Sequence, residues 1–121
     1  MSKDTVVIIL DTPCLKPMSN IDYQTVKAAM NLTNYDEAKL KAAKAIIAAN
    51  CVTSRQVAEL CMLFDFEQPK LILAKYAYKR CYDRKNYSKV VATLRSDPMK
   101  AALNYYIMGD YPIPVHVMQA K

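Results

Sequence analysis

Apolar residues recur at helical spacing along most of the chain. Val57, Leu60, Cys61 and Phe64 stand at positions i, i+3, i+4 and i+7, a spacing that gathers side chains on one face of an amphipathic helix. Comparable stripes precede and follow this segment between residues 19 and 109. The pattern therefore predicts a mainly α fold of five to six short helices.

The stretch from Asp65 to Tyr87 contains the most apolar of these predicted helices. Leu71, Ala74 and Tyr78 would line one helical face, and other apolar side chains cover much of the opposite face. A helix that is apolar around most of its circumference needs neighbours on several sides. We therefore expect the remaining elements to pack against this helix.

Capping residues divide the stripes into separate helices. Thr53 with Gln56 has the spacing of a capping box, in which two side chains satisfy free backbone N–H groups at a helix start. Ser19 is a second expected N-cap, because its hydroxyl oxygen can accept from an N–H group of the first turn. The other predicted boundaries are N-caps at Asn34 and Asp65, a stop or restart at Asp83 or Asn86, a first helical residue at Pro98 and a C′ residue at Gly109.

A sequence motif repeats along the chain. Residues Tyr35–Ala45 match Phe66–Tyr76 through a shared Lys-Leu-x-x-Ala-Lys, and Ser96–Tyr106 matches more weakly. The period of 30 to 31 residues is the length of one helix pair, and three such units are near the minimum for a stacked array. Amphipathic helices of similar length can match by chance, but the shared motif favours a true repeat of helical hairpins.

Both ends of the chain differ from the helical region. The β-branched run Val6–Leu10 predicts a short strand, and Pro13 and Pro17 exclude a helix through the residues after it. At the other end, Val115–Val117 could pair with that run as a small terminal strand pair. The predicted organisation is a strand-like arm over residues 1–18, a helical-hairpin domain over 19–109 and an extended, proline-containing tail over 110–121.

Composition supports one helical domain. The chain has 121 residues with 53% hydrophobic content, so it is long enough to bury roughly two-thirds of its unfolded surface. Gly109 is the only glycine, whereas a fold made of β-hairpins needs several turn glycines.

Positive charge is concentrated in the second half of the chain. The formal net charge is +6, and the basic residues between Lys70 and Lys100 are opposed there only by Asp83 and Asp97. Tyrosines interleave with these cations, a pattern that can stack on and neutralise single-stranded nucleic acid. The alternative is a solvated helix surface, and no known nucleic-acid-binding motif accompanies the charge. The candidate basic patch comprises Lys75, Lys79, Arg80, Arg84, Lys85 and Lys89.

The chain shows no pattern of catalytic or metal-binding residues. His116 is the only histidine, and the cysteines form no CxxC pair, so we expect neither a zinc site, a cofactor nor an enzymatic activity. Cys61 and Cys81 lie on apolar stripes and are expected to be buried. Cys14 and Cys51 fall in non-helical connections, where the geometry of a disulfide is easier to reach. We expect this pairing only if the protein is exported.

No signal peptide or membrane span is visible. The run Val6–Leu10 is too short for either, so two interpretations stay open. The protein is cytosolic, or this chain is a mature form or a fragment from which a leader has been removed.

Several motifs together resemble a family. They are Cys14-x-x-Pro17-Met18-Ser19, Lys39-Leu40-x-x-Ala43-Lys44, Asn50-Cys51-x-Thr53-Ser54-x-Gln56-Val57, Leu63-Phe64-x-Phe66-Glu67, Lys70-Leu71-x-x-Ala74-Lys75-Tyr76-Ala77-Tyr78 and Asp83-x-x-Asn86-Tyr87. The stretch that carries them, Cys14 to Ile107, resembles a largely bacterial group, family 4476 of the domains of unknown function. The family usually has another aromatic residue at the position of Ser96, so the third unit departs from its pattern.

The resemblance implies a compact helical domain, often the C-terminal part of exported or envelope proteins, with no assigned activity. It also favours a disulfide between Cys14 and Cys51, and it supplies no catalytic residues. The motif residues have the character of structural groups: Asp83 and Asn86 can bind nearby backbone, and Tyr87 would insert under the central helix. Lys44 and Lys75 would lie along the packed seam, and Tyr78 on its apolar stripe.

These observations lead to two hypotheses about function. The first is a non-catalytic protein-interaction or structural module, an accessory domain or subunit of a larger assembly, whose extended ends contact a protein partner by strand pairing. The second is binding to nucleic acid or to an anionic surface through the basic region between Lys70 and Lys100.

Overall fold

The described part of the chain is built from helices. The computed structural model describes residue 14 and residues 16–110, and within them it contains six α-helices and one 3₁₀ turn, which confirms the predicted mainly α fold. The predicted strands at Val6–Leu10 and Val115–Val117 lie outside the described residues. The elements are α2 (Asn20–Met30), α3 (Asp36–Ile47), α4 (Ser54–Cys61), α5 (Glu67–Tyr78), η1 (Arg84–Asn86), α6 (Ser88–Val91) and α7 (Asp97–Asp110).

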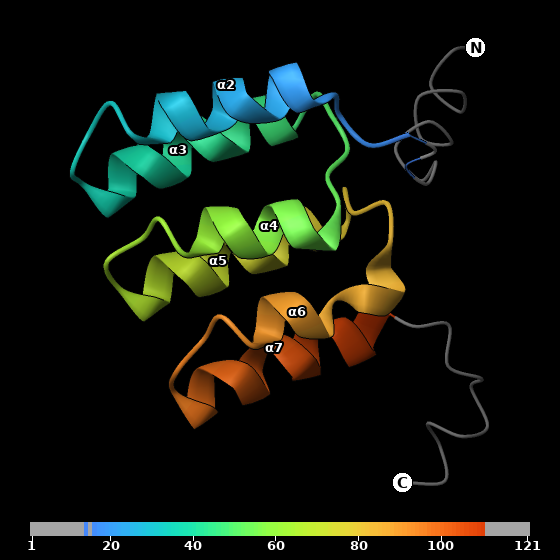
Figure 1. Cartoon of the computed structure of the whole chain (residues 1–121). Helices are drawn as coiled ribbons and strands as arrows, with labels where there is room; N and C mark the ends of the chain where they lie inside the picture. Colours follow the sequence, from blue (N-terminus) through green and yellow to red (C-terminus); the bar gives the residue numbers. More distant parts are fainter. Residues whose placement is uncertain (1–13, 15, 111–121) are drawn as a thin grey trace, which may run out of the picture.

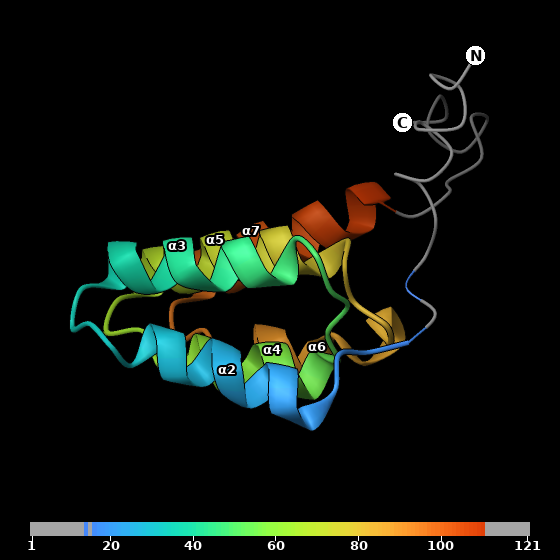
Figure 2. The same cartoon turned by 90° about the horizontal axis from the view of Figure 1, so that it is seen from above.

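Successive helices pair as hairpins, and the three hairpins stack side by side (Figure 1). Helices α2, α4 and α6 form one layer, and α3, α5 and α7 form the other (Figure 2). Because the period of the sequence motif is one hairpin, the matching segments become neighbouring helices of the same layer.

The core lies between the two layers and is centred on α5. Leu73, Ala74, Ala77 and Tyr78 of this helix are fully buried, and the helix contacts α3, α4 and α7. This is the environment expected for the most apolar helix of the chain. The predicted stripe of Val57, Leu60 and Cys61 on α4 is also buried, as is Phe64 just after this helix.

Two helices begin at the N-cap residues that the sequence predicts. Ser19 Oγ accepts from the backbone N–H of Asp22 at 3.1 Å, which caps α2. Thr53 and Gln56 form both hydrogen bonds of the predicted capping box at the start of α4. These contacts join residues within one turn, so a sequence pattern can specify them.

The predicted caps of α3 and α5 are wrong by one residue. Asn34 and Asp65 were expected as N-caps, but the N-cap residues are Tyr35 and Phe66, and neither makes a side-chain capping hydrogen bond. The carboxylate of Asp36 instead binds the backbone N–H of Asp65, so the preceding hairpin holds the start of α5.

The boundaries of α7 also differ from the prediction. The helix begins at Asp97, one residue before the predicted Pro98, and continues through Gly109 to Asp110. A C′ glycine needs a left-handed backbone, and no described residue has a positive φ. Gly109 is therefore a helical residue near the end of α7, where its weak helix propensity costs little.

Candidate functional site

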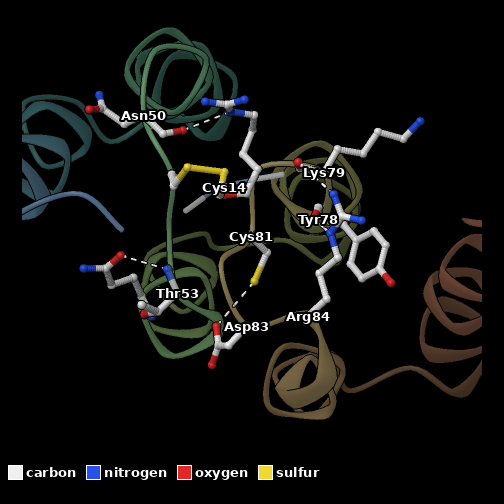
Figure 3. The surroundings of a disulfide bond; sticks show 11 residues. Cys14, Asn50, Thr53, Tyr78, Lys79, Cys81, Asp83 and Arg84 are labelled. Atoms are coloured by element: carbon white, nitrogen blue, oxygen red, sulfur yellow. Dashed lines mark hydrogen bonds between the residues drawn. A yellow bond between two sulfur atoms is a disulfide. The ribbon is translucent and has the colours of Figure 1, made fainter. Parts of the chain in front are cut away.

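A disulfide fixes the chain just before α2. Cys14 and Cys51 are bonded, with their Cα atoms 5.7 Å apart (Figure 3). The backbone N–H of Met18 also donates to the carbonyl of Cys51 at 2.8 Å. The two links attach the segment before α2 to the connection between α3 and α4.

The connection between α3 and α4 also pairs with the connection between α5 and η1 through backbone hydrogen bonds. The N–H of Val52 donates to the carbonyl of Arg80 at 2.9 Å, and the N–H of Tyr82 donates to the carbonyl of Val52 at 2.7 Å. These bonds form a single parallel bridge between Val52 and Cys81. Arg80 adds a hydrogen bond from Nε to the carbonyl of Asn50 at 3.0 Å, so the pairing spans both connections.

Asp83 holds the next connection in place. Its carboxylate accepts from the backbone N–H of Ser54 at 2.7 Å and from Nδ2 of Asn86 at 2.9 Å. Burial raises the pKa of Asp83, but the hydrogen bonds from Asn86 and Ser54 outweigh it and leave this pKa below its usual value. The structure thus places Asp83 and Asn86 in a contact between the second and third hairpins.

Tyr87 lies beneath the central helix. Its hydroxyl donates to the carbonyl of Ala74 at 2.6 Å, and its ring meets the edge of Tyr78 at a centroid distance of 4.9 Å. The Arg84 guanidinium lies 5.1 Å from the Tyr78 ring centroid. These residues occupy the interface between α5 and the third hairpin, and their contacts are structural.

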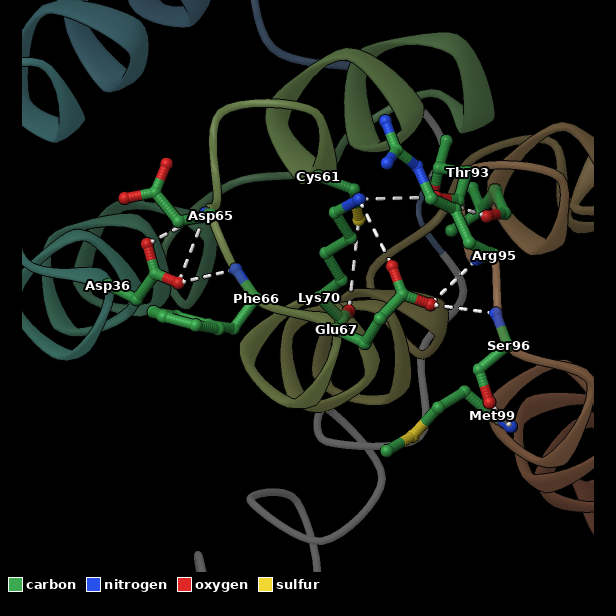
Figure 4. Close-up of polar contacts among 11 residues, drawn as sticks. Asp36, Cys61, Asp65, Phe66, Glu67, Lys70, Thr93, Arg95, Ser96 and Met99 are labelled. Carbon is green, nitrogen blue, oxygen red and sulfur yellow. Dashed lines mark hydrogen bonds and ion pairs between the residues drawn. The ribbon is translucent and has the colours of Figure 1, made fainter.

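A carboxylate at the start of one helix binds the loop of the next hairpin, and this contact occurs twice (Figure 4). Asp36 accepts from the backbone N–H of Phe66 at 2.9 Å, and Glu67 accepts from the N–H groups of Arg95 at 2.6 Å and Ser96 at 3.1 Å. Asp36 and Glu67 are the first residues of α3 and α5 and occupy the same position in the repeat. Burial raises the pKa of Glu67, but these N–H groups and Lys70 together lower it below its usual value.

A lysine also binds the next hairpin at an equivalent position. Lys39 Nζ donates to the carbonyl of Leu63 at 2.7 Å, and Lys70 Nζ donates to the carbonyl of Thr93 at 3.3 Å. Lys70 pairs in addition with Glu67 at 3.2 Å. Both lysines are buried, and an ammonium ion that loses its water needs such partners.

Lys44 and Lys75 make a third contact of this kind. The ammonium group of Lys44 lies 5.1 Å from the ring centroid of Tyr76, and that of Lys75 lies 5.8 Å from that of Tyr106. Each lysine therefore interacts with an aromatic face on the next helix of its layer. The carboxylate, lysine–carbonyl and lysine–ring contacts between successive hairpins are called the inter-hairpin contacts below.

The candidate basic patch is divided by its contacts. Arg80 and Arg84 donate to main-chain carbonyls, and Lys75 lies over an aromatic ring. The other three cations, Lys79 just after α5, Lys85 in η1 and Lys89 on α6, are exposed. The sequence therefore located the basic region, but it did not indicate which cations the fold itself uses.

The described residues contain no group of His, Cys, Asp and Glu that could hold a metal ion. Cys61 and Cys81 are free and buried, and burial raises the pKa of Cys61 to about 12. His116 lies outside the described residues. No helix in the described ranges is long and apolar enough to cross a membrane.

Large apolar side chains are exposed at the tips of the first two hairpins. The tips are the loops between α2 and α3 and between α4 and α5, which lie at the same end of the stack (Figure 1). The four exposed apolar side chains of these two loops are called the tip row below. They are Leu32 with an exposed fraction of 87%, Tyr35 with 77%, Met62 with 57% and Phe66 with 70%.

One comparison with known proteins gave a match. Residues 17–107 match a family model described as Domain of unknown function (DUF4476). Searches of curated proteins and of solved structures found no match.

Proposed function

The chain belongs to the DUF4476 family of domains of unknown function, and on that premise we propose that it is a non-catalytic protein-interaction module within a larger assembly. The observation that carries this proposal is the tip row. Apolar side chains of this size, gathered at one end of a small domain, mark a surface that another protein covers. Aromatic residues are enriched in such interfaces.

The tip row is also held in a fixed shape. The Asp36 carboxylate binds the backbone N–H of Phe66, and Lys39 binds the carbonyl of Leu63, so the first turn of α3 is joined to the loop between α4 and α5. A binding surface that is rigid before contact loses less conformational entropy when the partner binds. This supports the tip row as a docking surface for a protein.

Site-specific photocrosslinking tests the proposal. A photoreactive amino acid at Tyr35 or Phe66, introduced in the cells from which the gene comes, should form a covalent adduct with one and the same partner. The same amino acid at the exposed Lys89 on α6 is the matched control. The combined substitution Tyr35→Ser and Phe66→Ser should abolish the complex and keep the helical circular dichroism spectrum.

Absence of adducts at the tip row, with the protein present at its normal level, would contradict this use of the tip row. Absence of adducts at every exposed position would contradict an interaction function altogether.

A second candidate function is binding to nucleic acid or another anionic surface. The exposed Lys79, Lys85 and Lys89 support it, and such binding should weaken steeply as salt is added. Fluorescence anisotropy with labelled single-stranded oligonucleotides at low salt tests it. No binding at micromolar protein would remove this candidate.

A further inference from the structure

The layer formed by α3, α5 and α7 has an outer face that no other described helix covers. Helices α2, α4 and α6 all lie on the opposite side of it (Figure 2). The tip row is separate from this face, since it lies on the loops at the end of the hairpins. The outer face therefore needs its own explanation.

Two grooves run along this face, one on each side of α5. The groove between α3 and α5 has a volume of about 460 Å³, and the groove between α5 and α7 has a volume of about 420 Å³. In each groove a lysine lies over a tyrosine of the next helix, Lys44 over Tyr76 and Lys75 over Tyr106. The repeat has thus placed the same lysine–tyrosine pair in both grooves, although the other lining residues differ.

Small residues on the outer helices leave both grooves open. Ala45 of α3 and Ala48, the residue that follows this helix, line the first groove, and Ala102 and Gly109 of α7 line the second. A Cβ atom added at Gly109 would meet nothing within 4 Å. The backbone of another helix could approach these positions closely, as it does wherever small residues line a helix contact.

The charge of the grooves is positive. Lys41 and Lys44 line the first groove with Glu37 as the one acid, and Lys75 and Lys79 line the second. The ion pairs of the described residues are Arg55–Glu59 and Lys70–Glu67, so these lysines have no carboxylate partner within that part of the chain. The face therefore combines aromatic and aliphatic surface with an excess of positive charge.

We propose that the outer face of α3, α5 and α7 binds an acidic amphipathic helix of a partner protein. The apolar side of such a helix fills a groove, and its carboxylates meet the lysines along the rim. Helix α3 has 12 residues, about 18 Å at 1.5 Å per residue, so the groove takes a helix of about three turns. The inference rests on the proposed interaction function but uses a different surface from the tip row.

Binding of a designed peptide to the whole chain tests the proposal. The probe is a labelled peptide of about 14 residues, roughly 21 Å long as a helix, with glutamates on one face and leucines on the other. A peptide of the same composition, scrambled so that it has no apolar face, is its control. The expected result is saturable binding of the amphipathic peptide and no binding of the scrambled one.

Charge-reversal variants locate the site. The pair Lys41→Glu and Lys79→Glu changes two exposed groove lysines, and the pair Lys85→Glu and Lys89→Glu makes the same charge change at exposed positions outside the α3–α5–α7 layer. The groove pair should weaken peptide binding by about tenfold or more, close to 1.4 kcal/mol, and the control pair by less than about threefold. Circular dichroism verifies that both variants fold.

Three outcomes would overturn the proposal. The first is absence of binding, and the second is equal loss of binding in both variants, which shows attraction to net charge alone. The third is tighter binding of a single-stranded oligonucleotide or of anionic phospholipid vesicles with the same variant dependence, which assigns the face to that ligand. Photocrosslinking at the tip row is unaffected by any of these results, so a failure here is distinct from a failure of the proposed interaction function.

Discussion

At the scale of single residues, the polar side chains with defined roles mostly bind main-chain atoms. Tyr87 and Lys39 donate to carbonyls, and Asp36 and Glu67 accept from backbone N–H groups. A buried main-chain group that loses its partner destabilises the fold. These positions therefore require a particular atom at a particular distance, and charge or polarity alone does not replace it.

Replacement of Tyr87 should lower stability in two distinguishable steps. Tyr87→Phe removes the hydrogen bond to the carbonyl of Ala74 and should lower the free energy of unfolding by about 1 kcal/mol. Tyr87→Ala also removes a ring that is only 2% exposed, so the loss should reach about 3–5 kcal/mol. Urea unfolding followed by circular dichroism measures both. The half-exposed Tyr82, changed to Phe, is the control, and an equal effect there would contradict the assignment.

Stability should also fall at high pH. Burial raises the pKa of Tyr87 well above its usual value, and burial together with the hydrogen bond to Glu59 raises that of Tyr23. In the unfolded chain a tyrosine ionises near pH 10, so the stabilisation is complete below that pH and is lost as the pH rises further. Urea midpoints measured at increasing pH test this. The midpoint should fall as the pH rises, and it should fall less steeply with pH in the variant Tyr87→Phe. A slope unchanged in that variant would contradict the claim for Tyr87.

At the scale of elements, the inter-hairpin contacts determine how each helix is placed against the next. Asp36→Ala and Glu67→Ala each remove a carboxylate that holds the following loop, and each should lower the free energy of unfolding by about 1–2 kcal/mol. The loss is limited because both side chains are partly solvent-accessible. Chemical denaturation measures it. Glu37→Ala, one residue along α3 and exposed, is the control. An equal loss of stability in this variant would show that the effect comes from charge or helix propensity and not from the hydrogen bond to the loop.

The disulfide is the covalent contact between elements. It closes a loop with a sequence separation of 37 residues, and such a cross-link stabilises by about 2–4 kcal/mol, mainly by restricting the unfolded chain. The combined change Cys14→Ala and Cys51→Ala should lower the urea midpoint of the oxidised protein accordingly. A reducing agent should lower the midpoint of the parent chain and leave that of the variant unchanged. An equal shift in both chains would show that the effect of the reducing agent does not come from the Cys14–Cys51 bond.

Sequence patterns predicted the local features of these elements. The capping box at Thr53 and Gln56 was predictable because both residues lie within one turn. The cap expected at Asp65 was wrong because the start of α5 depends on Asp36, 29 residues before it. The cap expected at Asn34 was wrong by one residue as well, since Tyr35 is the N-cap of α3. Asp36 and Glu67 stand at helix starts, a position that by itself indicates only a local role for a carboxylate. The main-chain groups that these carboxylates bind cannot be recognised in the sequence, because every loop residue except proline has the same N–H group. The one signal that could have indicated a shared role is that the two acids occupy the same position in the repeat.

At the scale of the whole molecule, one continuous core runs through all three hairpins. Tyr87, Val90, Leu94 and Leu103 of the third hairpin are buried with residues of the first two. The second hairpin therefore has no complete core without the third, as is general for short stacked arrays.

Truncation tests this dependence. A chain that ends at Asp83 lacks the third hairpin, and it exposes the side of α5 against which Tyr87 packs. We expect it to lose the cooperative urea transition of the full chain and most of its helical circular dichroism signal. A sharp transition with a similar midpoint would show instead that two hairpins form an independent unit.

The inter-hairpin contacts have a consequence for how such a chain can evolve. The carboxylate and lysine–carbonyl contacts end on peptide groups of the next hairpin, and every amino acid except proline supplies both kinds of peptide group. The loop that is bound can therefore mutate without losing the bond, and the constraint falls on the residue that reaches toward it. A duplicated segment of one period would arrive with its donors and acceptors already matched to its parent. Chains of this type can thus gain a hairpin in a single genetic event while each existing joint keeps its geometry.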